Sequence, residues 1–366
     1  MIYVPMLKNR QEELKVAKEL NYCFSNKIIP LFEILKDIYK VQYKKDPITG
    51  DYIYIQKGKK KQKVKEESTD SDIITLEHIN DLINGKVAFI DFFRFSKDKY
   101  GNNIDLSSVD LSVRISFNIN LYKKRVLEVT KYKNLIPVIS IKPSFKFKKN
   151  DLRDFLIELQ TKSKSIGLRI TDHFIQDYKD LIESLLRDSD FLLFDIEEQN
   201  PKSKVMELEE IMELKTLSKK ILLNSPRKAS IFNREFEESG ITKLIDNSAR
   251  DIFSEYVFHG FGDYCGYKDA LPEKRNNYGV GAALALIYQY EDNGFYSFCN
   301  HKIKGFSGYR DIIESILKMK HYFEKINKCP GLEKIKNLQI KRKTGNWATW
   351  NNIIITRYIH QMYLNI

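Results

Sequence analysis

Cysteine is scarce in this chain, and its spacing excludes two classes of small fold. The 366 residues include four cysteines, Cys23, Cys265, Cys299 and Cys329, and no CxxC pair. A disulfide-built fold is denser in cysteine, and a zinc ribbon needs paired cysteines. We therefore expect four reduced thiols in a cytoplasmic protein.

Glycine, proline and long apolar runs are also sparse. The 16 glycines and 9 prolines exclude collagen-like and low-complexity chains. No window approaches the roughly 18 apolar residues that a membrane-spanning helix needs, and the N-terminus becomes charged too early for a signal peptide. The sequence has no GxxxxGKS/T motif, no glycine fingerprint after the first predicted strand and no GxSxG turn. These absences predict no membrane partner and no nucleophile elbow. They also argue against a nucleotide-binding open sheet.

Acidic residues are outnumbered by basic ones. The chain has 61 Lys and Arg against 49 Asp and Glu, a formal net charge of +12. This excess favours association with polyanions such as nucleic acid. Part of it is concentrated in a run of six lysines between residues 57 and 65. A solvated loop and a phosphate-contacting arm both fit this run.

Short apolar runs alternate with amphipathic stretches along most of the chain. Such alternation predicts parallel strands joined by crossover helices, and continuous apolar character indicates strands buried on both faces. A (β/α)8 barrel and an open doubly wound sheet both fit, and the missing glycine fingerprint favours the barrel. The better-defined runs cover residues 28–34, 87–93, 135–141, 167–171, 191–196, 220–224 and 257–262.

We predict an α/β fold, a TIM-like (β/α)8 barrel over residues 1–300 followed by a helical C-terminal segment, 301–366, packed on it. A polar, lysine-rich insertion at 40–72 interrupts the barrel. Turn chemistry in DPITGD and the strand-like YIYI predict a hairpin there. The apolar runs at 282–290 and 294–299 predict a late strand pair.

Carboxylates recur inside or just after four of the apolar runs. They are Glu33, Asp91, Asp195 and Asp263, and Arg169 falls in the same predicted layer. An ionised side chain there is costly unless it is paired or bound to a metal. Because the C-terminal strand ends of a barrel carry its chemistry, we predict that these four acids bind Mg²⁺ or Mn²⁺.

Such a metal would activate a water or polarise a phosphoryl oxygen, with Asp195, Asp263 and Arg169 as catalytic residues. Arginine would neutralise phosphate charge. The alternative is a buried ion-pair network, Arg169 with Asp91 or Asp195, that only closes the barrel end. Further polar residues near the strand ends predict substrate contacts, and these are Arg94, Lys142 and Tyr264.

The C-terminal segment ends in a predicted amphipathic helix. Asn346 fits its N-cap, and Trp350, Ile353, Arg357, His360 and Leu364 follow at three- or four-residue steps, so they share one face. In one interpretation this helix seals the barrel, with its tryptophan rings in the core. In the other, Arg357 reaches the barrel mouth to bind substrate and His360 acts there as a general acid or base.

Three stretches resemble the phage Beta-protein family. They are YVPMLKNRQEELKVAKEL leading to IIPLFEI, the turn GFGDYCGY and the terminal GNWATWNNIIITRYIH. The resemblance implies an intracellular bacterial or phage protein with a role in phage–host conflict, and the lysine-rich insertion is unlike typical members. The positions on which it falls are Glu33, Asp91, Arg169, Asp195, 262–264, Trp350 and His360.

Three functions fit these features. The first is a metal-dependent phosphodiester hydrolase or nuclease in an anti-phage defence or toxin setting. The second is a non-catalytic recognition module that binds a phage protein or nucleic acid and signals to a partner effector, with Tyr52 and Tyr54 of the insertion as anchors. The third is a barrel enzyme for a small phosphorylated metabolite or nucleotide, with phosphate near Gly279, Gly281 and Gly294. No heptad or repeat predicts a particular oligomer.

Overall fold

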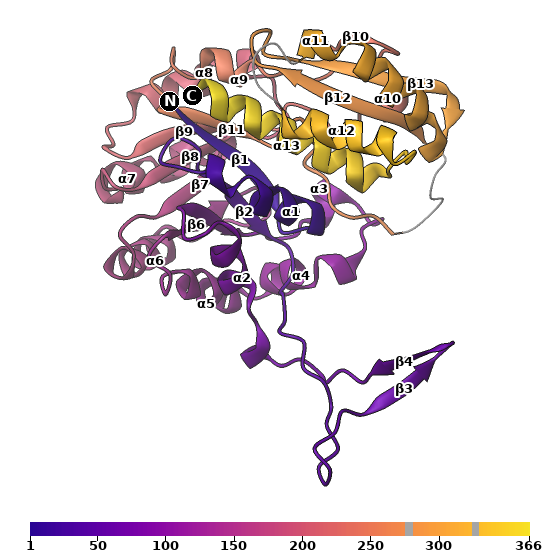
Figure 1. Cartoon of the computed structure of the whole chain (residues 1–366). Helices are drawn as coiled ribbons and strands as arrows, with labels where there is room; N and C mark the ends of the chain where they lie inside the picture. Colours follow the sequence, from indigo (N-terminus) through magenta and orange to yellow (C-terminus); the bar gives the residue numbers. More distant parts are fainter. Residues whose placement is uncertain (275–280, 324–328) are drawn as a thin grey trace.

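Eight parallel strands close into a barrel in the computed structural model, which describes residues 1–274, 281–323 and 329–366 (Figure 1). Around the barrel the order is β1-β11-β9-β8-β7-β6-β5-β2, with β2 beside β1. This closure confirms the predicted TIM-like barrel and excludes the open sheet. The strands are β1 (Ile2–Lys8), β2 (Leu31–Ile34), β5 (Ala88–Phe92), β6 (Leu135–Ile141), β7 (Gly167–Thr171), β8 (Phe191–Asp195), β9 (Lys219–Leu223) and β11 (Gly260–Asp263).

The first strand, β1, was missed by sequence reasoning. Its run IYVPMLK is broken by Pro5, and proline within a run argues against a central strand. The structure places Pro5 where the pairing of β1 changes, because residues 2–5 pair with β11 and residues 6–8 pair with β2. A residue without an N–H is tolerated at this change of partner.

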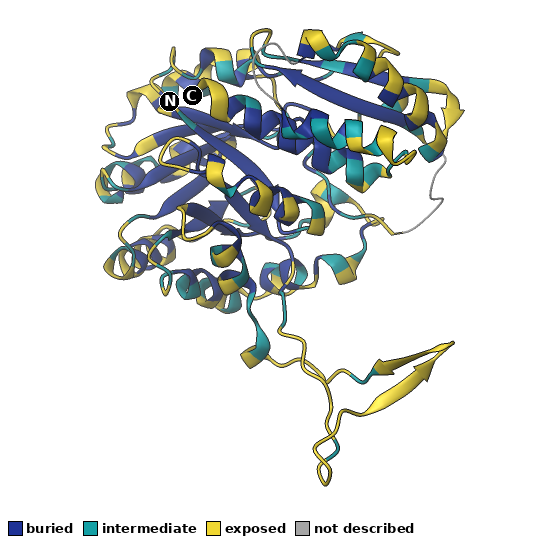
Figure 2. Ribbon diagram, viewed as in Figure 1, coloured by how far each residue is buried: buried dark blue, intermediate teal, exposed yellow. Residues whose placement is uncertain are grey.

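Helices cover the outside of the barrel with their apolar faces (Figure 2). Residues 110–129 form two helices, because the Asn118 side chain caps a new helix by accepting from Leu121 N. The α-helices up to β11 are α1 (Gln11–Glu19), α2 (Thr75–Leu82), α3 (Lys97–Tyr100), α4 (Asp110–Phe117), α5 (Ile119–Val129), α6 (Lys149–Lys162), α7 (Ile175–Leu185), α8 (Val205–Glu213) and α9 (Ala249–Ile252). Short 3-10 turns are η1 (Asn21–Cys23), η2 (Asp70–Asp72), η3 (Leu106–Ser108), η4 (Asp172–Phe174), η5 (Pro201–Ser203), η6 (Asn233–Glu235) and η7 (Gly305–Gly308).

The late strand pair forms outside the barrel. Together with β10 it makes a separate antiparallel sheet in the order β10-β13-β12, so the predicted boundary at residue 300 falls inside β13. Three helices cover this sheet and enclose a second apolar core; residues 324–328 of the predicted helical segment lie outside the described ranges. The elements are β10 (Gly240–Ile241), β12 (Ala282–Gln289), β13 (Gly294–Lys304), α10 (Tyr309–Lys318), α11 (Lys320–Phe323) and α12 (Pro330–Ile340).

The last helix, α13 (Trp347–Asn365), joins the two cores. Asn346 caps it as predicted, accepting from Thr349 N at 2.9 Å. Tyr358 belongs to the barrel core, and Trp350, nearer the start of the helix, belongs to the second core. Figure 1 shows α13 along the side of the barrel, with the two chain ends close together. None of the described helices is both long and apolar enough to cross a membrane.

The insertion arm, residues 40–72, projects from the body of the protein (Figures 1 and 2). It contains the antiparallel hairpin of β3 (Tyr54–Lys57) and β4 (Lys60–Lys63), which confirms the predicted hairpin. All but one of the eight strand residues are exposed. Packing within the arm is local, as where Lys63 Nζ lies 3.5 Å from the Tyr52 ring centroid.

Candidate functional site

The inward-facing side chains of the barrel change from apolar to polar at the C-terminal strand ends, here called the mouth. Alternation along each strand places Val4, Leu31 and Leu193 in the apolar interior. Two or four residues further along the same strands, the inward positions are polar. The polar layer comprises Lys8, Glu33, Asp91, Ser140, Arg169, Asp195 and Tyr264.

Arg169 is the centre of this layer and is 1% exposed. Its Nη1 donates to Glu33 Oε1 at 2.7 Å and to Asp91 Oδ2 at 2.9 Å, and its Nε donates to Asp195 Oδ2 at 2.8 Å. Burial acts to lower the pKa of the guanidinium, but Asp195, Tyr264 and the other two acids raise it well above its ordinary value. We call these four charged residues, Arg169, Glu33, Asp91 and Asp195, the mouth cluster.

A second set of contacts extends the mouth cluster to the loop after β11. Lys8 Nζ donates to Glu33 Oε2 at 2.6 Å and to Asp269 Oδ1 at 2.8 Å. Lys99 Nζ reaches the other oxygen of Asp269 at 2.8 Å. Burial acts to raise the pKa of Glu33, but Lys8 and then Arg169 outweigh it, so the pKa lies well below its usual range. Glu33 and Asp269 are therefore held as carboxylates.

Three members of this network were missed by sequence reasoning: Lys8, Lys99 and Asp269. Lys8 ends the strand that was not recognised, although the inward pattern Val4, Met6, Lys8 is a signal that could have found it. Lys99 lies in the short helix α3 and Asp269 in the loop after β11, and only the fold brings them together.

Three of the predicted acids, Glu33, Asp91 and Asp195, do lie together. They form the buried ion-pair network of the alternative interpretation. Their oxygens face Arg169 and Lys8, and the described residues contain no group of three or more His, Cys, Asp or Glu side chains that could hold a metal ion. Asp91 Oδ1 is buried and has no hydrogen-bond partner among the described residues. A Mg²⁺ or Mn²⁺ ion would have to replace guanidinium contacts, and it stays a prediction.

A cavity of about 170 Å³ opens beside the mouth cluster, and Lys142, Arg94 and Lys99 line it. The Lys142 ammonium has no hydrogen bond or ion pair within the described ranges and lies 4.9 Å from the Phe93 ring centroid. Burial, and secondarily Arg169, lowers its pKa, although nearby acids act in the opposite direction. Lys142 is thus a cation at the mouth without a bound anion.

Arg94, also predicted to bind substrate, has its guanidinium engaged. It packs 4.4 Å from the Tyr122 ring centroid and donates to the carbonyl oxygens of Ser140 and Phe145. Tyr264, the third predicted contact, donates to Glu33 Oε1 at 2.8 Å. Arg94 shapes the cavity wall, and Tyr264 orients a member of the mouth cluster.

Asp263 does not join the other three acids. It is the neighbour of inward-facing Tyr264, so alternation turns it to the outside of the barrel. There it accepts from Tyr3 Oη at 3.1 Å, Tyr358 Oη at 2.7 Å and Cys265 N at 2.7 Å. Burial raises its pKa to about 6, against the effect of these hydrogen bonds. This corrects the expectation of four acids in one ring.

Arg357 and His360 also lie away from the mouth. Arg357 is fully buried, and its Nε donates to Tyr288 O at 2.7 Å. The chain end after α13 lies beside the start of β1, opposite the mouth, because Lys27 Nζ donates to Ile366 O at 2.6 Å. His360 is therefore directed toward the far end of the barrel, where burial and then Arg357 lower its pKa. The sealing interpretation of this helix is the one that fits.

Comparison with known proteins gives one result for nearly the whole chain. A family model described as "Beta protein" matches residues 3–363. No curated protein matches the sequence. The matched range includes all eight barrel strands except the first residue of β1, the small sheet and most of α13. The chain therefore belongs to the Beta protein family.

Proposed function

We propose that the barrel mouth is the active site of an enzyme that acts on a small phosphorylated substrate. The observation that carries this proposal is the Lys142 ammonium, which lines a mouth cavity and has no anionic partner among the described residues. A cation that is partly removed from water is costly unless it is paired, and a phosphate group would pair it. The position agrees with the general placement of active sites in such barrels.

Cavity size favours a small substrate over a nucleic-acid strand. The volume of about 170 Å³ lies below the roughly 300–1,000 Å³ of sites for drug-sized ligands. A phosphate ester with a short carbon chain fits this space. Gly281 and Gly294, considered as phosphate contacts, lie in the small sheet region away from this cavity, and Gly279 lies outside the described residues.

Two groups supply chemistry in this proposal. Lys142 binds the substrate phosphate, and Asp91 Oδ1, the carboxylate oxygen without a partner in the described part of the chain, accepts a proton from water or from a substrate hydroxyl. Arg169 holds Asp91 in place through its other oxygen. Arg169 is thus a positioning residue, since its own donors are occupied by the three acids.

The metal-dependent phosphodiester hydrolase or nuclease is a narrower form of the same proposal. Convergence of Glu33, Asp91 and Asp195 supports it, because carboxylate oxygens are the preferred ligands of Mg²⁺ and Mn²⁺. It requires Arg169 to release them. Metal dependence of any activity decides between the two forms.

The insertion arm supports a second candidate function, recognition of nucleic acid. Lys57 pairs with Lys60 across the hairpin, and like charges directly opposite are destabilising. The segment 53–65 has six lysines and no acidic residue, with Tyr54 exposed on the same strand. A phosphate backbone would relieve this repulsion, and Tyr54 would stack on a base. A phage protein remains the other proposed partner.

We place this activity in the cytoplasm and in phage–host conflict. Cys23, Cys265 and Cys299 are free and buried, which fits a reducing compartment. The conflict setting, as anti-phage defence or as a toxin, rests on the resemblance to the phage Beta-protein family.

A screen of phosphate esters tests the proposed function. Purified protein would be incubated with sugar phosphates, nucleotides, RNA and DNA, each with Mg²⁺, Mn²⁺ or EDTA, and phosphate release and strand cleavage would be measured. We expect release from a small ester that Lys142→Met abolishes and Lys146→Met preserves, because Lys146 lies nearby but is about half exposed. Equal activity in both variants would contradict the proposal.

A further inference from the structure

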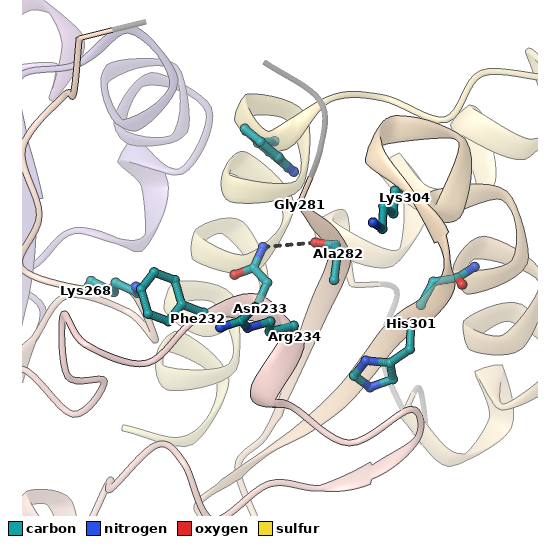
Figure 3. A pocket seen from close by; sticks show the side chains of 10 residues that line it. Phe232, Asn233, Arg234, Lys268, Gly281, Ala282, His301 and Lys304 are labelled. Carbon is teal, nitrogen blue, oxygen red and sulfur yellow. Dashed lines mark hydrogen bonds between the residues drawn. The ribbon is translucent and has the colours of Figure 1, made fainter. Parts of the chain in front are cut away.

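A second and larger pocket, of about 720 Å³, lies between the loop after β9, the small sheet and the start of α13. Figure 3 shows Arg234 and Lys268 on one side of Ala282 and Lys304 and His301 on the other. These side chains come from η6, from the loop after β11 and from β13. We call this the basic pocket. It shares no lining residue with the mouth cavity.

The basic pocket has an uncompensated positive charge. Its described lining contains four basic side chains and no Asp or Glu. The side chains of Arg234 and Lys304 have no ion pair or hydrogen bond among the described residues. Within the same residues, Lys268 Nζ donates only to the carbonyl oxygen of Ala229, at 2.9 Å. Glu235, beside Arg234, is turned away and accepts from Phe232 N at 2.8 Å.

Crowding of like charge adds to this excess. Burial and then Arg227 lower the pKa of Lys268, although Glu198, Glu273 and Glu235 act in the opposite direction. Arg227 itself has a pKa lowered to about 10 by burial. Cations that repel one another in this way bind an anion with several oxygens favourably, because each gains a charge-assisted hydrogen bond.

Aromatic rings form the rest of the wall. Trp347 packs against Phe306 with 5.4 Å between ring centroids, which leaves the buried indole Nε1 without an acceptor in the described part of the chain. Phe232 is 60% exposed at the opposite side.

We propose that the basic pocket binds a nucleoside phosphate. The phosphate oxygens accept from Lys304, Arg234 and Lys268, and the base packs on the face of the Trp347 ring. The volume falls within the range of roughly 300–1,000 Å³ that ligand sites occupy. Free nucleotide and the terminal nucleotide of a strand present the same chemistry. The site is independent of the proposed mouth activity.

Binding to the full-length protein tests this inference. ATP, adenosine, pyrophosphate and a ten-nucleotide single strand would be titrated by calorimetry and by tryptophan fluorescence. Trp350 is buried and stacked on Tyr309, so ring stacking by ATP should quench Trp347 and the quenching should disappear in Trp347→Phe. We expect ATP to bind at least about 10-fold more tightly than adenosine or pyrophosphate.

Charge reversal locates the site. Lys304→Glu and Arg234→Glu should each weaken ATP binding by about 10-fold or more, because each removes a charge-assisted hydrogen bond. Lys302→Glu, on the same strand but outside the pocket, should leave it unchanged, as should Lys142→Met at the mouth. Circular dichroism checks folding of every variant.

Several outcomes overturn the proposal. One is the absence of ATP binding at millimolar concentration. Another is an equal loss of ATP affinity in Lys302→Glu and Lys304→Glu. A third is pyrophosphate binding as tight as ATP binding. Tighter binding of the single strand than of ATP, with the same loss in Lys304→Glu, supports the terminal nucleotide as the source. Tighter binding of ATP supports free nucleotide. Loss of mouth activity in Lys142→Met with ATP binding intact separates the two sites.

Discussion

Arg169 and Glu33 meet across the barrel, with 2.7 Å between Nη1 and Oε1. They come from β7 and β2, which are separated in the barrel wall by β6 and β5. A single hydrogen bond therefore joins strands that do not pair, directly above the apolar interior. Because Asp91 and Asp195 bind the same guanidinium, the charge of Arg169 stabilises three buried acids at once.

Removing Arg169 should destabilise the barrel strongly. Arg169→Met leaves Glu33, Asp91 and Asp195 buried with one fewer cation, and breaking a buried ion pair on one side costs about 3–5 kcal/mol. Urea unfolding at pH 7 would measure the change in the free energy of unfolding. Arg153→Met, on the exposed face of α6, is the matched control and should change it by less than about 0.5 kcal/mol. A similar small change in both variants would contradict the account.

Asp263 should make stability fall as the pH rises through the weakly acidic range. Its pKa is about 6 in the folded protein against an ordinary value of 3.8, because burial disfavours the carboxylate. Between these values the folded state holds a proton that the unfolded state has lost. The unfolding free energy therefore decreases from about pH 4 to about pH 6, by about 3 kcal/mol in all.

Asp263→Asn is the variant that isolates this effect. The asparagine side chain does not ionise, so the unfolding free energy of the variant should lack the decrease that Asp263 causes between about pH 4 and about pH 6. The difference between the wild-type and variant curves, measured by urea unfolding at closely spaced pH values, gives the contribution of Asp263. A difference that is constant from pH 4 to pH 6.5 would show that Asp263 is ionised normally.

The hydroxyl of Tyr358 should contribute to stability at neutral pH. It donates to Asp263 at 2.7 Å from α13, and Tyr358→Phe leaves the buried carboxylate with fewer donors. We expect a loss of about 1–3 kcal/mol, as for other hydrogen bonds to buried charged groups. Thermal unfolding at pH 7.5 and pH 5 would measure it, and the loss should be smaller at pH 5, where more of Asp263 is protonated. A loss independent of pH would argue against a charge-assisted bond.

Local periodicity of the sequence predicted most of the barrel strands and part of the site. The apolar runs predicted seven of the eight barrel strands, and polar residues at their ends included Glu33, Asp91, Arg169 and Asp195. The eighth strand was missed because Pro5 interrupts it. Asp263 was misplaced because the inward or outward direction of a strand residue depends on register, which nearby strands set and the run itself does not.

The C-terminal helix shows the same limit at the tertiary level. Spacing identified a shared face with Trp350 and Arg357, but both faces of α13 are apolar because it lies between two cores. The face that carries Arg357 is buried against β12 and α11, where its guanidinium donates to the backbone oxygens of Tyr288 and Phe323. Only the separate sheet of β12 and β13, which sequence reasoning assigned to the barrel domain, explains this placement.

The insertion arm should be dispensable for folding and required for nucleic-acid binding outside the basic pocket. Its ends meet where Lys40 N donates to Asp72 O at 2.8 Å, so a deletion of residues 41–71 can be closed by a short glycine linker. We expect an unchanged melting temperature and loss of salt-dependent binding to single-stranded DNA or RNA. Replacement of Lys57, Lys60 and Lys63 by Glu should have the same effect on binding. Retained salt-dependent binding in either variant would exclude the arm as the nucleic-acid-binding surface.

The affinity of the mouth for substrate should fall at high pH. Burial and Arg169 lower the pKa of Lys142 from 10.5, whereas the phosphate of a substrate stays dianionic above about pH 7. The Michaelis constant for a phosphate ester should therefore rise as the pH increases through the lowered pKa of Lys142. Steady-state kinetics from pH 7 to pH 11 would measure this rise, and Lys146→Met should show the same rise. A constant that does not change over this range would exclude Lys142 as the phosphate ligand.

The most direct test of the mouth site is a calorimetric titration with glycerol phosphate. Every protein titrated carries Lys304→Glu, which weakens binding in the basic pocket. Lys142→Met should weaken binding by about 10-fold or more relative to this background, as expected when a charge-assisted hydrogen bond is lost. Lys146→Met should bind like the background. Equal affinities in the Lys142 and Lys146 variants would contradict the assignment of the barrel mouth as a phosphate-binding active site.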